Sequence, residues 1–131
     1  MKKGKKMERY KVILVDDEAE VIDMIEKKIH WNDLGFEVAG SATNGVKALE
    51  LVEKLQPDVV LTDIKMPYMD GLELSRRLNR EYPNIYIMLC TGFDEFEYAK
   101  EAVHLEIKEY MLKPINAVEL SECLTRLKDT L

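Results

Sequence analysis

Cysteine is scarce in this sequence, which contains only Cys90 and Cys123. Two cysteines so far apart cannot build a disulfide framework, and they lack the close pairing of a cysteine metal site. We expect both side chains to be free, buried thiols. Any functional site must therefore be built from other residue types.

Positive charge is also in deficit, because 19 lysines and arginines face 25 aspartates and glutamates and give a net charge of -6. A protein that grips nucleic acid needs a basic face to neutralise phosphates. This balance argues against nucleic-acid binding by this domain on its own.

Long apolar runs are missing, so no stretch approaches the roughly 18 residues of a membrane span. The basic start resembles a signal peptide, but the apolar run behind it covers only Val12 to Val15 and ends at an acid. We expect a cytoplasmic protein with no membrane segment. Residues 1–9 are expected to form a disordered basic tail, and residues 10–131 one domain of ordinary size.

The chain does contain a regular alternation of short apolar runs and amphipathic segments, which predict strands and helices respectively. The predicted strands lie at 12–15, 36–39, 59–61, 85–89 and 109–112, and the predicted helices at 18–29, 44–55, 72–80, 93–103 and 116–128, with 31–35 as a loop. This order predicts an α/β fold, a doubly wound five-stranded parallel sheet with helices on both sides.

The stretch from Asp58 to Gly71 organises the predicted fold. Its apolar start reads as a strand covered on both faces, and the run stops at Asp63. Turn residues follow: Pro67 fixes its own φ, and Gly71 is free to take a positive φ. A carboxylate thus sits where a buried strand opens into a loop, and sites form at that edge of a parallel sheet.

Polar residues follow other predicted strands in the same way. Asp16 and Asp17 follow the first strand, Thr91 follows the fourth and Lys113 follows the fifth. All these strand ends lie along one edge of a parallel sheet, so we expect the side chains to converge around Asp63. The alternative is that the acids are solvated or cap the first helix, that Lys113 is a surface lysine and that Thr91 only forms a turn.

The chemistry of such a cluster is specific. Carboxylates held together repel one another unless a cation shares the site, and oxygen-only ligands suit Mg²⁺ better than Zn²⁺. Lys113 can pair with a carboxylate or a phosphoryl oxygen, and Thr91 can donate a hydrogen bond to an anion. Together they describe a site where a carboxylate attacks a phosphoryl group and forms an acyl phosphate.

These residues resemble the receiver domain of two-component response regulators, over nearly the whole chain from Tyr10 to about Leu127. The matching motifs are Asp16-Asp17, Asp63, Met66-Pro67, Met69-Asp70-Gly71, Thr91-Gly92 and Tyr110 through Lys113-Pro114. The resemblance implies a flavodoxin-like fold with strand order 2-1-3-4-5 and five helices.

The resemblance also implies a role for each site residue. Asp63 would be the phosphoacceptor and would receive its phosphoryl group from a histidine kinase. The implied ligands of Mg²⁺ are Asp17, Asp63 and the backbone carbonyl of Lys65, with Asp16 acting through water. Lys113 would contact the phosphoryl group, and Thr91 and Tyr110 would be the switch pair that moves on phosphorylation. Lys65 departs from the usual pattern by its basic side chain, although the metal would use only its carbonyl.

Two further stretches resemble receivers attached to AraC-type DNA-binding domains: Trp31 with Leu34 to Val38, and Gly92 to Ala99. This resemblance implies a helix-turn-helix output beyond Leu131 that alone would bind DNA. Phosphorylation would then create a homodimer surface from the fourth predicted helix, the fifth strand and the last helix. Its expected residues are Phe96, Tyr98, Ala102, His104 and Tyr110.

Other classes of protein use a similar sheet. An aspartate-dependent phosphatase usually has a second acid two residues after its nucleophile, and here that position holds Lys65. A flavin or nucleotide binder needs a phosphate-cradling loop after the first strand, where Asp16, Asp17 and Glu18 stand instead. A free-standing receiver without an output domain would differ only in its partner. We therefore expect a signalling domain that is not an enzyme.

Overall fold

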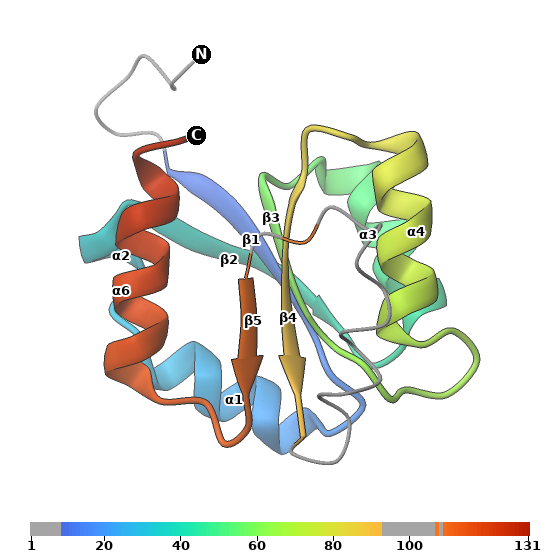
Figure 1. The fold of residues 1–131 in the computed structure, drawn as a ribbon, viewed down its shortest axis with the longest axis horizontal. Coiled ribbons are helices and arrows are strands. Elements are labelled where there is room, and N and C mark those ends of the chain that lie inside the picture. Colours follow the sequence, from blue (N-terminus) through green and yellow to red (C-terminus); the bar gives the residue numbers. More distant parts are fainter. Residues whose placement is uncertain (1–8, 93–106, 108) are drawn as a thin grey trace.

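A computed structural model of the protein describes residues 9–92, 107 and 109–131 (Figure 1). The strands are β1 (Tyr10–Val15), β2 (Phe36–Ala42), β3 (Val59–Asp63), β4 (Tyr86–Thr91) and β5 (Glu109–Leu112). The helices are α1 (Ala19–Lys28), α2 (Trp31–Leu34), α3 (Gly45–Leu55), α4 (Gly71–Glu81) and α6 (Ala117–Lys128). The predicted helix at 93–103 and nearly all of the predicted tail lie outside the described residues.

The five strands form one parallel sheet in the order β2-β1-β3-β4-β5, which confirms the predicted fold class. Because every strand runs the same way, all carboxyl ends lie along one edge, at the bottom of Figure 1. The C-terminal end of α6 lies at the opposite edge.

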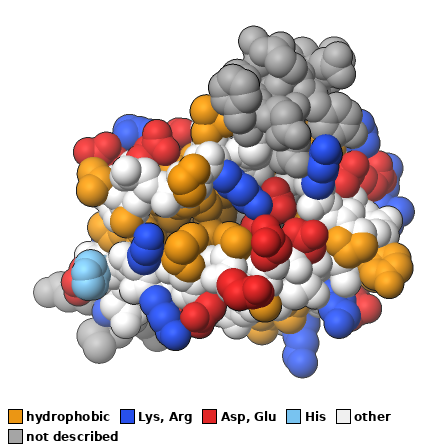
Figure 2. Space-filling model, turned by 90° about the horizontal axis from the view of Figure 1, so that it is seen from below, with side chains coloured by type: hydrophobic (Ala, Val, Ile, Leu, Met, Phe, Trp, Pro, Cys, Tyr) orange, Lys and Arg blue, Asp and Glu red, His pale blue; other side chains and the backbone are white. Residues whose placement is uncertain are grey.

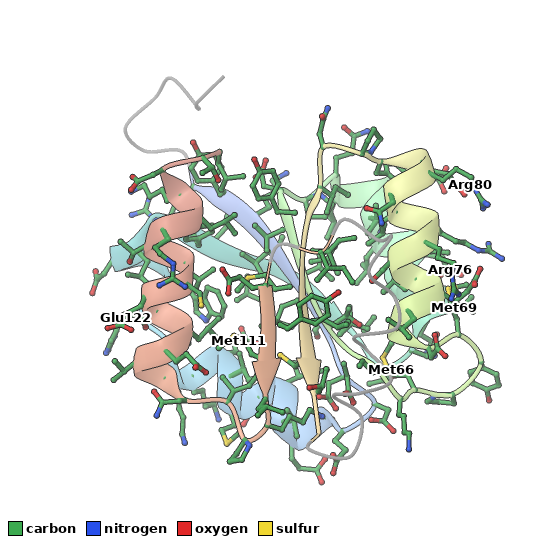
Figure 3. All side chains as sticks on the ribbon, viewed as in Figure 1. Met66, Met69, Arg76, Arg80, Met111 and Glu122 are labelled. Carbon is green, nitrogen blue, oxygen red and sulfur yellow. The ribbon has the colours of Figure 1, made fainter. Side chains whose placement is uncertain are left out.

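Two apolar layers bury the sheet, one on each face. Val12 and Leu14 of β1 pack in the layer that contains α1 and α6, whereas Ile13 and Val15 pack in the layer that contains α3 and α4. Figure 3 shows Met111 of β5 on the α6 side of the sheet. A strand buried on both faces needs apolar residues at successive positions, which explains the unbroken apolar runs.

Three helices begin at residues suited to cap them. The side chains of Asn44, Asp70 and Asn116 accept hydrogen bonds of 2.8–2.9 Å from backbone N–H groups three residues later, at the starts of α3, α4 and α6. Each such cap typically contributes about 1 kcal/mol to helix stability.

The prediction of a loop at 31–35 was wrong, because α2 forms a single helical turn there. Trp31 is buried, and its indole N–H donates to the carbonyl of Glu26 at 3.1 Å. Gly35, with a φ of 89°, ends the turn in the left-handed region. Burial of one large side chain stabilises a helix too short to show any apolar periodicity.

Four strands extend further than predicted: β1 begins at Tyr10, β3 ends at Asp63, and β2 and β4 also continue past their predicted ends. β2 continues to Ala42 and contains an irregularity. Val12 of β1 pairs with Val38, but the next residue, Ile13, pairs with Gly40, so Ala39 is an extra residue in β2. Such a bulge breaks the alternation along the strand. β4 runs to Thr91, which therefore lies within the strand and not after it.

The cysteines are free and buried, as expected. Burial raises the pKa of the Cys90 thiol to about 12, so this side chain behaves as a small apolar group. Within the described part of the chain, no helix is both long enough and apolar enough to span a membrane.

Candidate functional site

An ammonium group joins two buried carboxylates at the carboxyl edge of the sheet. The Nζ atom of Lys113 lies 3.0 Å from Oδ2 of Asp16 and 3.1 Å from Oδ2 of Asp63. The two aspartate side chains are only 5% exposed, and that of Lys113 is 23% exposed. Figure 2 looks onto this edge and shows acidic side chains gathered near its centre. The predicted convergence of Asp16, Asp63 and Lys113 is therefore present.

The alternation of side chains along each strand explains why these three meet. Asp16 and Lys113 follow β1 and β5 directly, and Asp63 is the last residue of β3. Each stands two positions after an apolar residue of the layer that contains α1 and α6. These apolar residues are Leu14, Leu61 and Met111. Residues two apart in a strand point to the same face, so all three polar side chains emerge on one side of the sheet.

Asp63 is held through both of its carboxylate oxygens. Oδ1 accepts a hydrogen bond of 2.8 Å from the backbone N–H of Ile64, and Oδ2 faces Lys113. The pKa of Asp63 is raised to about 6, chiefly by burial and in smaller part by the charge of Asp16, against the lowering effect of Lys113. The site thus carries more negative charge than Lys113 balances.

Lys113 stays charged in this position. Burial disfavours its ammonium form, but hydrogen bonds to Asp16 and Asp63 outweigh that effect and raise the pKa of Lys113 above its ordinary value. A permanent positive charge next to a carboxylate suits a site that must accept a further anion.

A group of acidic side chains adjoins Asp16. One carboxylate oxygen from each of Asp16, Asp17 and Glu18 lies within 4.8 Å of the others, and Asp17 and Glu18 are exposed. Asp16 also accepts a hydrogen bond of 2.9 Å from the N–H of Glu18, so it supports the start of α1 while pairing with Lys113. An all-oxygen donor set of this kind can hold a hard cation such as Mg²⁺.

Thr91 and Tyr110, the predicted switch pair, occupy neighbouring strands. Leu89 pairs with Tyr110 and Thr91 with Leu112, so Thr91 and Tyr110 are diagonal neighbours on one sheet face. Thr91 is fully buried, and its hydroxyl has no hydrogen-bond partner within the described residues. Tyr110 is 37% exposed. Thr91 is one residue beyond Cys90, which pairs with Asp63.

The loop between β3 and α4 carries Lys65, the predicted carbonyl ligand, with its side chain exposed. Met66 and Met69 pack against the layer of α3 and α4 at the lower end of α4 (Figure 3). These two side chains anchor the loop, whereas Tyr68 between them is 89% exposed.

Gly71 does not take the positive φ that is open to a glycine; the left-handed residue in this loop is Tyr68, with a φ of 70°. Gly71 begins α4, and its N–H donates to the carbonyl of Ile64 at 2.7 Å. A Cβ atom on Gly71 would lie 2.0 Å from the carbonyl oxygen of Asp63. The glycine is needed for this close approach. The sequence motif pointed to the position but not to this reason.

Part of the expected dimer surface can be placed. Phe96, Tyr98, Ala102 and His104 lie outside the described residues. Among the residues that the structure describes, large apolar side chains are exposed on β5, at Tyr110 and Leu112, and on α6, at Val118.

Comparison with known proteins gives a consistent result. The family model for the response regulator receiver domain matches residues 12–125. The chain is 43% identical over 115 residues to the transcriptional regulatory protein YesN of Bacillus subtilis, covering 88% of this chain and 31% of YesN. It is 34% identical over 122 residues to the transcriptional regulatory protein HptR of Staphylococcus aureus, covering 93% of this chain and 48% of HptR. The chain thus spans 31% to 48% of the length of these curated relatives.

Solved structures show the same fold. The receiver domain of AraT, a response regulator from Geobacillus stearothermophilus, superposes with a TM-score of 0.88 at 39% identity, covering 92% of this chain and 94% of that one. A two-component transcriptional regulator AraC from Clostridium phytofermentans gives a TM-score of 0.85 at 32% identity, again over 92% and 94% of the two chains. With the matched motifs and the Asp16–Lys113–Asp63 cluster, these findings show that the chain belongs to the response regulator receiver domain family.

Proposed function

We propose that Asp63 accepts a phosphoryl group from a histidine kinase and that this modification regulates a C-terminal DNA-binding output. The observation that carries the proposal is the ammonium of Lys113 between Asp16 and Asp63, at 3.0 and 3.1 Å, beside further exposed acids. This arrangement combines a nucleophile, a cation for an incoming phosphoryl group and oxygen ligands for a metal.

The transfer itself is a nucleophilic displacement at phosphorus. Oδ2 of Asp63 attacks the phosphorus of a phosphohistidine, and a new P–O bond forms as the P–N bond breaks. The electron pair of that P–N bond returns to the imidazole nitrogen, which takes up a proton as it leaves. Lys113, already beside Oδ2, then pairs with the phosphoryl oxygens of the acyl phosphate.

Asp16, Asp17, Asp63 and the carbonyl of Lys65 would hold Mg²⁺. The fit rests on the donor chemistry, since these groups offer only oxygen atoms, and on the two buried carboxylates that share the single ammonium of Lys113. When bound, Mg²⁺ supplies positive charge to the phosphoryl oxygens. We assign Asp16 the water-mediated position, as the resemblance to receiver domains implies.

Phosphorylation would be read out through Thr91 and Tyr110. The hydroxyl of Thr91 is buried and lacks a partner within the described residues, so a new anion at Asp63 would attract it. Its movement would make room for the Tyr110 ring and change the face formed by β5, α6 and the preceding segment. We propose that this face forms a homodimer, that the protein acts in the cytoplasm, and that it is a signalling domain without an enzymatic turnover of its own.

The test is incubation of the protein with acetyl phosphate and Mg²⁺, followed by intact mass measurement. We expect a gain of one phosphoryl group that is absent with EDTA and absent in Asp63→Asn. Asp70→Asn is the matched control, because asparagine caps a helix as well as aspartate does and Asp70 has no role in transfer. This variant should gain the phosphoryl group like the wild type.

The proposal fails if the wild type gains no mass, or if Asp63→Asn gains as much as the wild type. Release of phosphate in large excess over the protein, without any mass gain, would instead indicate a phosphatase.

A further inference from the structure

We propose that Thr62 is a positioning residue for Asp63: its hydroxyl holds the peptide group between Asp63 and Ile64, and that peptide group orients the carboxylate. The inference rests on the proposed role of Asp63 as phosphoacceptor. It concerns the residue before the nucleophile, whose side chain has no place in the chemistry described above.

The contacts form a short chain from Thr62 to the carboxylate. Thr62 is fully buried, and its Oγ1 donates to the carbonyl oxygen of Asp63 at 2.9 Å. The same peptide group ends in the N–H of Ile64, which donates to Oδ1 of Asp63 at 2.8 Å. Because a peptide group is planar and stiff, fixing its carbonyl also fixes the direction of its N–H.

Contacts with Gly71 also limit the movement of this peptide group. The Cα of Gly71 packs so close that an added Cβ would meet the carbonyl oxygen of Asp63 at 2.0 Å. The N–H of Gly71 also donates to the carbonyl of Ile64 at 2.7 Å. The side chain of Ile64 is buried in a small cluster with Leu72 and Leu89. The backbone after the nucleophile is therefore held at two successive carbonyl groups.

The consequence for Asp63 is a defined orientation of its two oxygens. With Oδ1 engaged by the N–H of Ile64, Oδ2 is turned to Lys113 at 3.1 Å, where the phosphoryl group must arrive. Small errors in the direction of an attacking atom cost rate, because the reacting atoms must be aligned before the bond forms.

The core itself does not require a hydroxyl at this position. Valine has nearly the same shape as threonine and suits the interior of a strand that is buried on both faces. A buried hydroxyl costs free energy unless it is hydrogen-bonded, and here its bond goes to Asp63 itself. We infer that the hydroxyl serves the nucleophile next to it.

The test compares variants that differ in the hydroxyl alone. Thr62→Val keeps the shape and removes the hydroxyl, whereas Thr62→Ser and Thr62→Ala both lose the methyl group and differ from each other only by the hydroxyl. Thr125→Val is the control, because the Thr125 hydroxyl also donates to a backbone carbonyl, that of Ser121 at 2.9 Å, but on the exposed surface of α6. Initial rates of mass gain are measured against acetyl phosphate concentration at saturating Mg²⁺.

We expect Thr62→Val and Thr62→Ala to lower the maximal rate about fivefold to tenfold, the effect of one lost hydrogen bond on the barrier. The acetyl phosphate concentration at half-saturation should not change. Thr62→Ser and Thr125→Val should react like the wild type. The amide proton of Ile64 should shift in Thr62→Val and Thr62→Ala and return in Thr62→Ser, which a purely structural role would not produce.

A wild-type rate in Thr62→Val would overturn the inference and leave the proposed function intact. If Thr62→Val does not fold, the comparison of Thr62→Ser with Thr62→Ala decides the matter, and equal rates in these two would also overturn it. If the wild type gains no phosphoryl group, the proposed function fails, and the Ile64 amide shifts still test the hydrogen-bonded chain.

Discussion

Asp63 carries its negative charge in surroundings that disfavour it. Burial raises its pKa from 3.8 to about 6, so the folded protein releases this proton less easily than the unfolded chain. Ionisation of Asp63 therefore costs folding stability, and the cost develops as the pH rises from about 4 and is complete above about 7. A divalent cation or a second ammonium group beside Asp63 would reduce this cost in folding stability.

Replacement of Asp63 by asparagine should stabilise the domain. In EDTA at pH 7.5, we expect Asp63→Asn to raise the free energy of unfolding by about 1–2 kcal/mol, after allowance for solvent screening and the lost contact with Lys113. Because the wild-type carboxyl group is protonated in the folded state at low pH, the gain should shrink toward pH 4. Urea unfolding at several pH values measures both effects, and a variant less stable than the wild type at pH 7.5 would contradict the interpretation.

Replacement of Lys113 should, in contrast, destabilise the domain. Lys113→Met keeps the length of the side chain but leaves two buried carboxylates without their shared cation, so we expect a loss of about 2–4 kcal/mol at pH 7.5. In the double variant with Asp63→Asn, one repelling charge is gone and much of the loss should be recovered. A double-mutant cycle by urea unfolding measures this coupling, and simple additivity would show that the two groups act independently.

Single residues of the site differed in how far the sequence alone could place them. Asp16, Asp63 and Lys113 were predictable because each stands at the end of a strand or directly after it, and parallel strands end along one edge. The hydrogen bond from Thr62 to the backbone of Asp63 could not be predicted, because a threonine within an apolar run is typical of a β-branched core residue.

Among the elements, the start of α4 shows most clearly how local preference and tertiary packing diverge. A glycine in a helix normally costs up to about 1 kcal/mol relative to alanine, so helix propensity alone favours replacing Gly71. In the structure, however, the added methyl group would strike the backbone carbonyl of Asp63. A clash with backbone cannot be relieved by a side-chain rotation.

We therefore expect Gly71→Ala to destabilise the domain by about 1–3 kcal/mol, as overpacking does. It should also slow phosphorylation, because the displaced carbonyl belongs to the nucleophile. Gly40→Ala is the control: its added methyl group would meet the flexible end of Leu55 at 3.2 Å, and its effect should be under about 1 kcal/mol. Thermal and urea unfolding of both variants distinguish the two sites, and a more stable Gly71→Ala would show that helix propensity dominates.

The remaining elements show which patterns a sequence displays. Strands buried on both faces give unbroken apolar runs, and capping residues mark the starts of α3, α4 and α6. The single turn of α2 is too short for periodicity and depends on the burial of Trp31. The end of β2 was hidden because a bulge at Ala39 interrupts its alternation. The helical turn of α2 and the bulge in β2 depend on contacts with distant parts of the chain, so the local sequence does not reveal them.

At the scale of the whole molecule, the site and the C-terminal end of α6 lie at opposite edges of the sheet (Figure 1). The proposed signal from Asp63 to a following domain must therefore pass along the sheet or between two copies of the protein. Strand β5 is an edge strand next to the site, and its exposed Tyr110 and Leu112 offer apolar area for a second copy. In the proposed mechanism, a change at this face is a short route from the phosphoryl group on Asp63 to the formation of a dimer.

Sedimentation with Mg²⁺ and beryllofluoride, which mimics a phosphoryl group on aspartate, tests this route. We expect a monomer without beryllofluoride and a dimer with it at high micromolar concentration. Leu112→Asp should remain monomeric, because a charge on β5 cannot be buried between two copies without a partner. Val46→Asp on α3 is the matched control: Val46 is 44% exposed and Leu112 is 43% exposed, but α3 packs over β1 and β2 at the other end of the sheet. A beryllofluoride-bound wild type that stays monomeric, or a Leu112→Asp variant that dimerises as well as Val46→Asp, would show that β5 is not part of the interface.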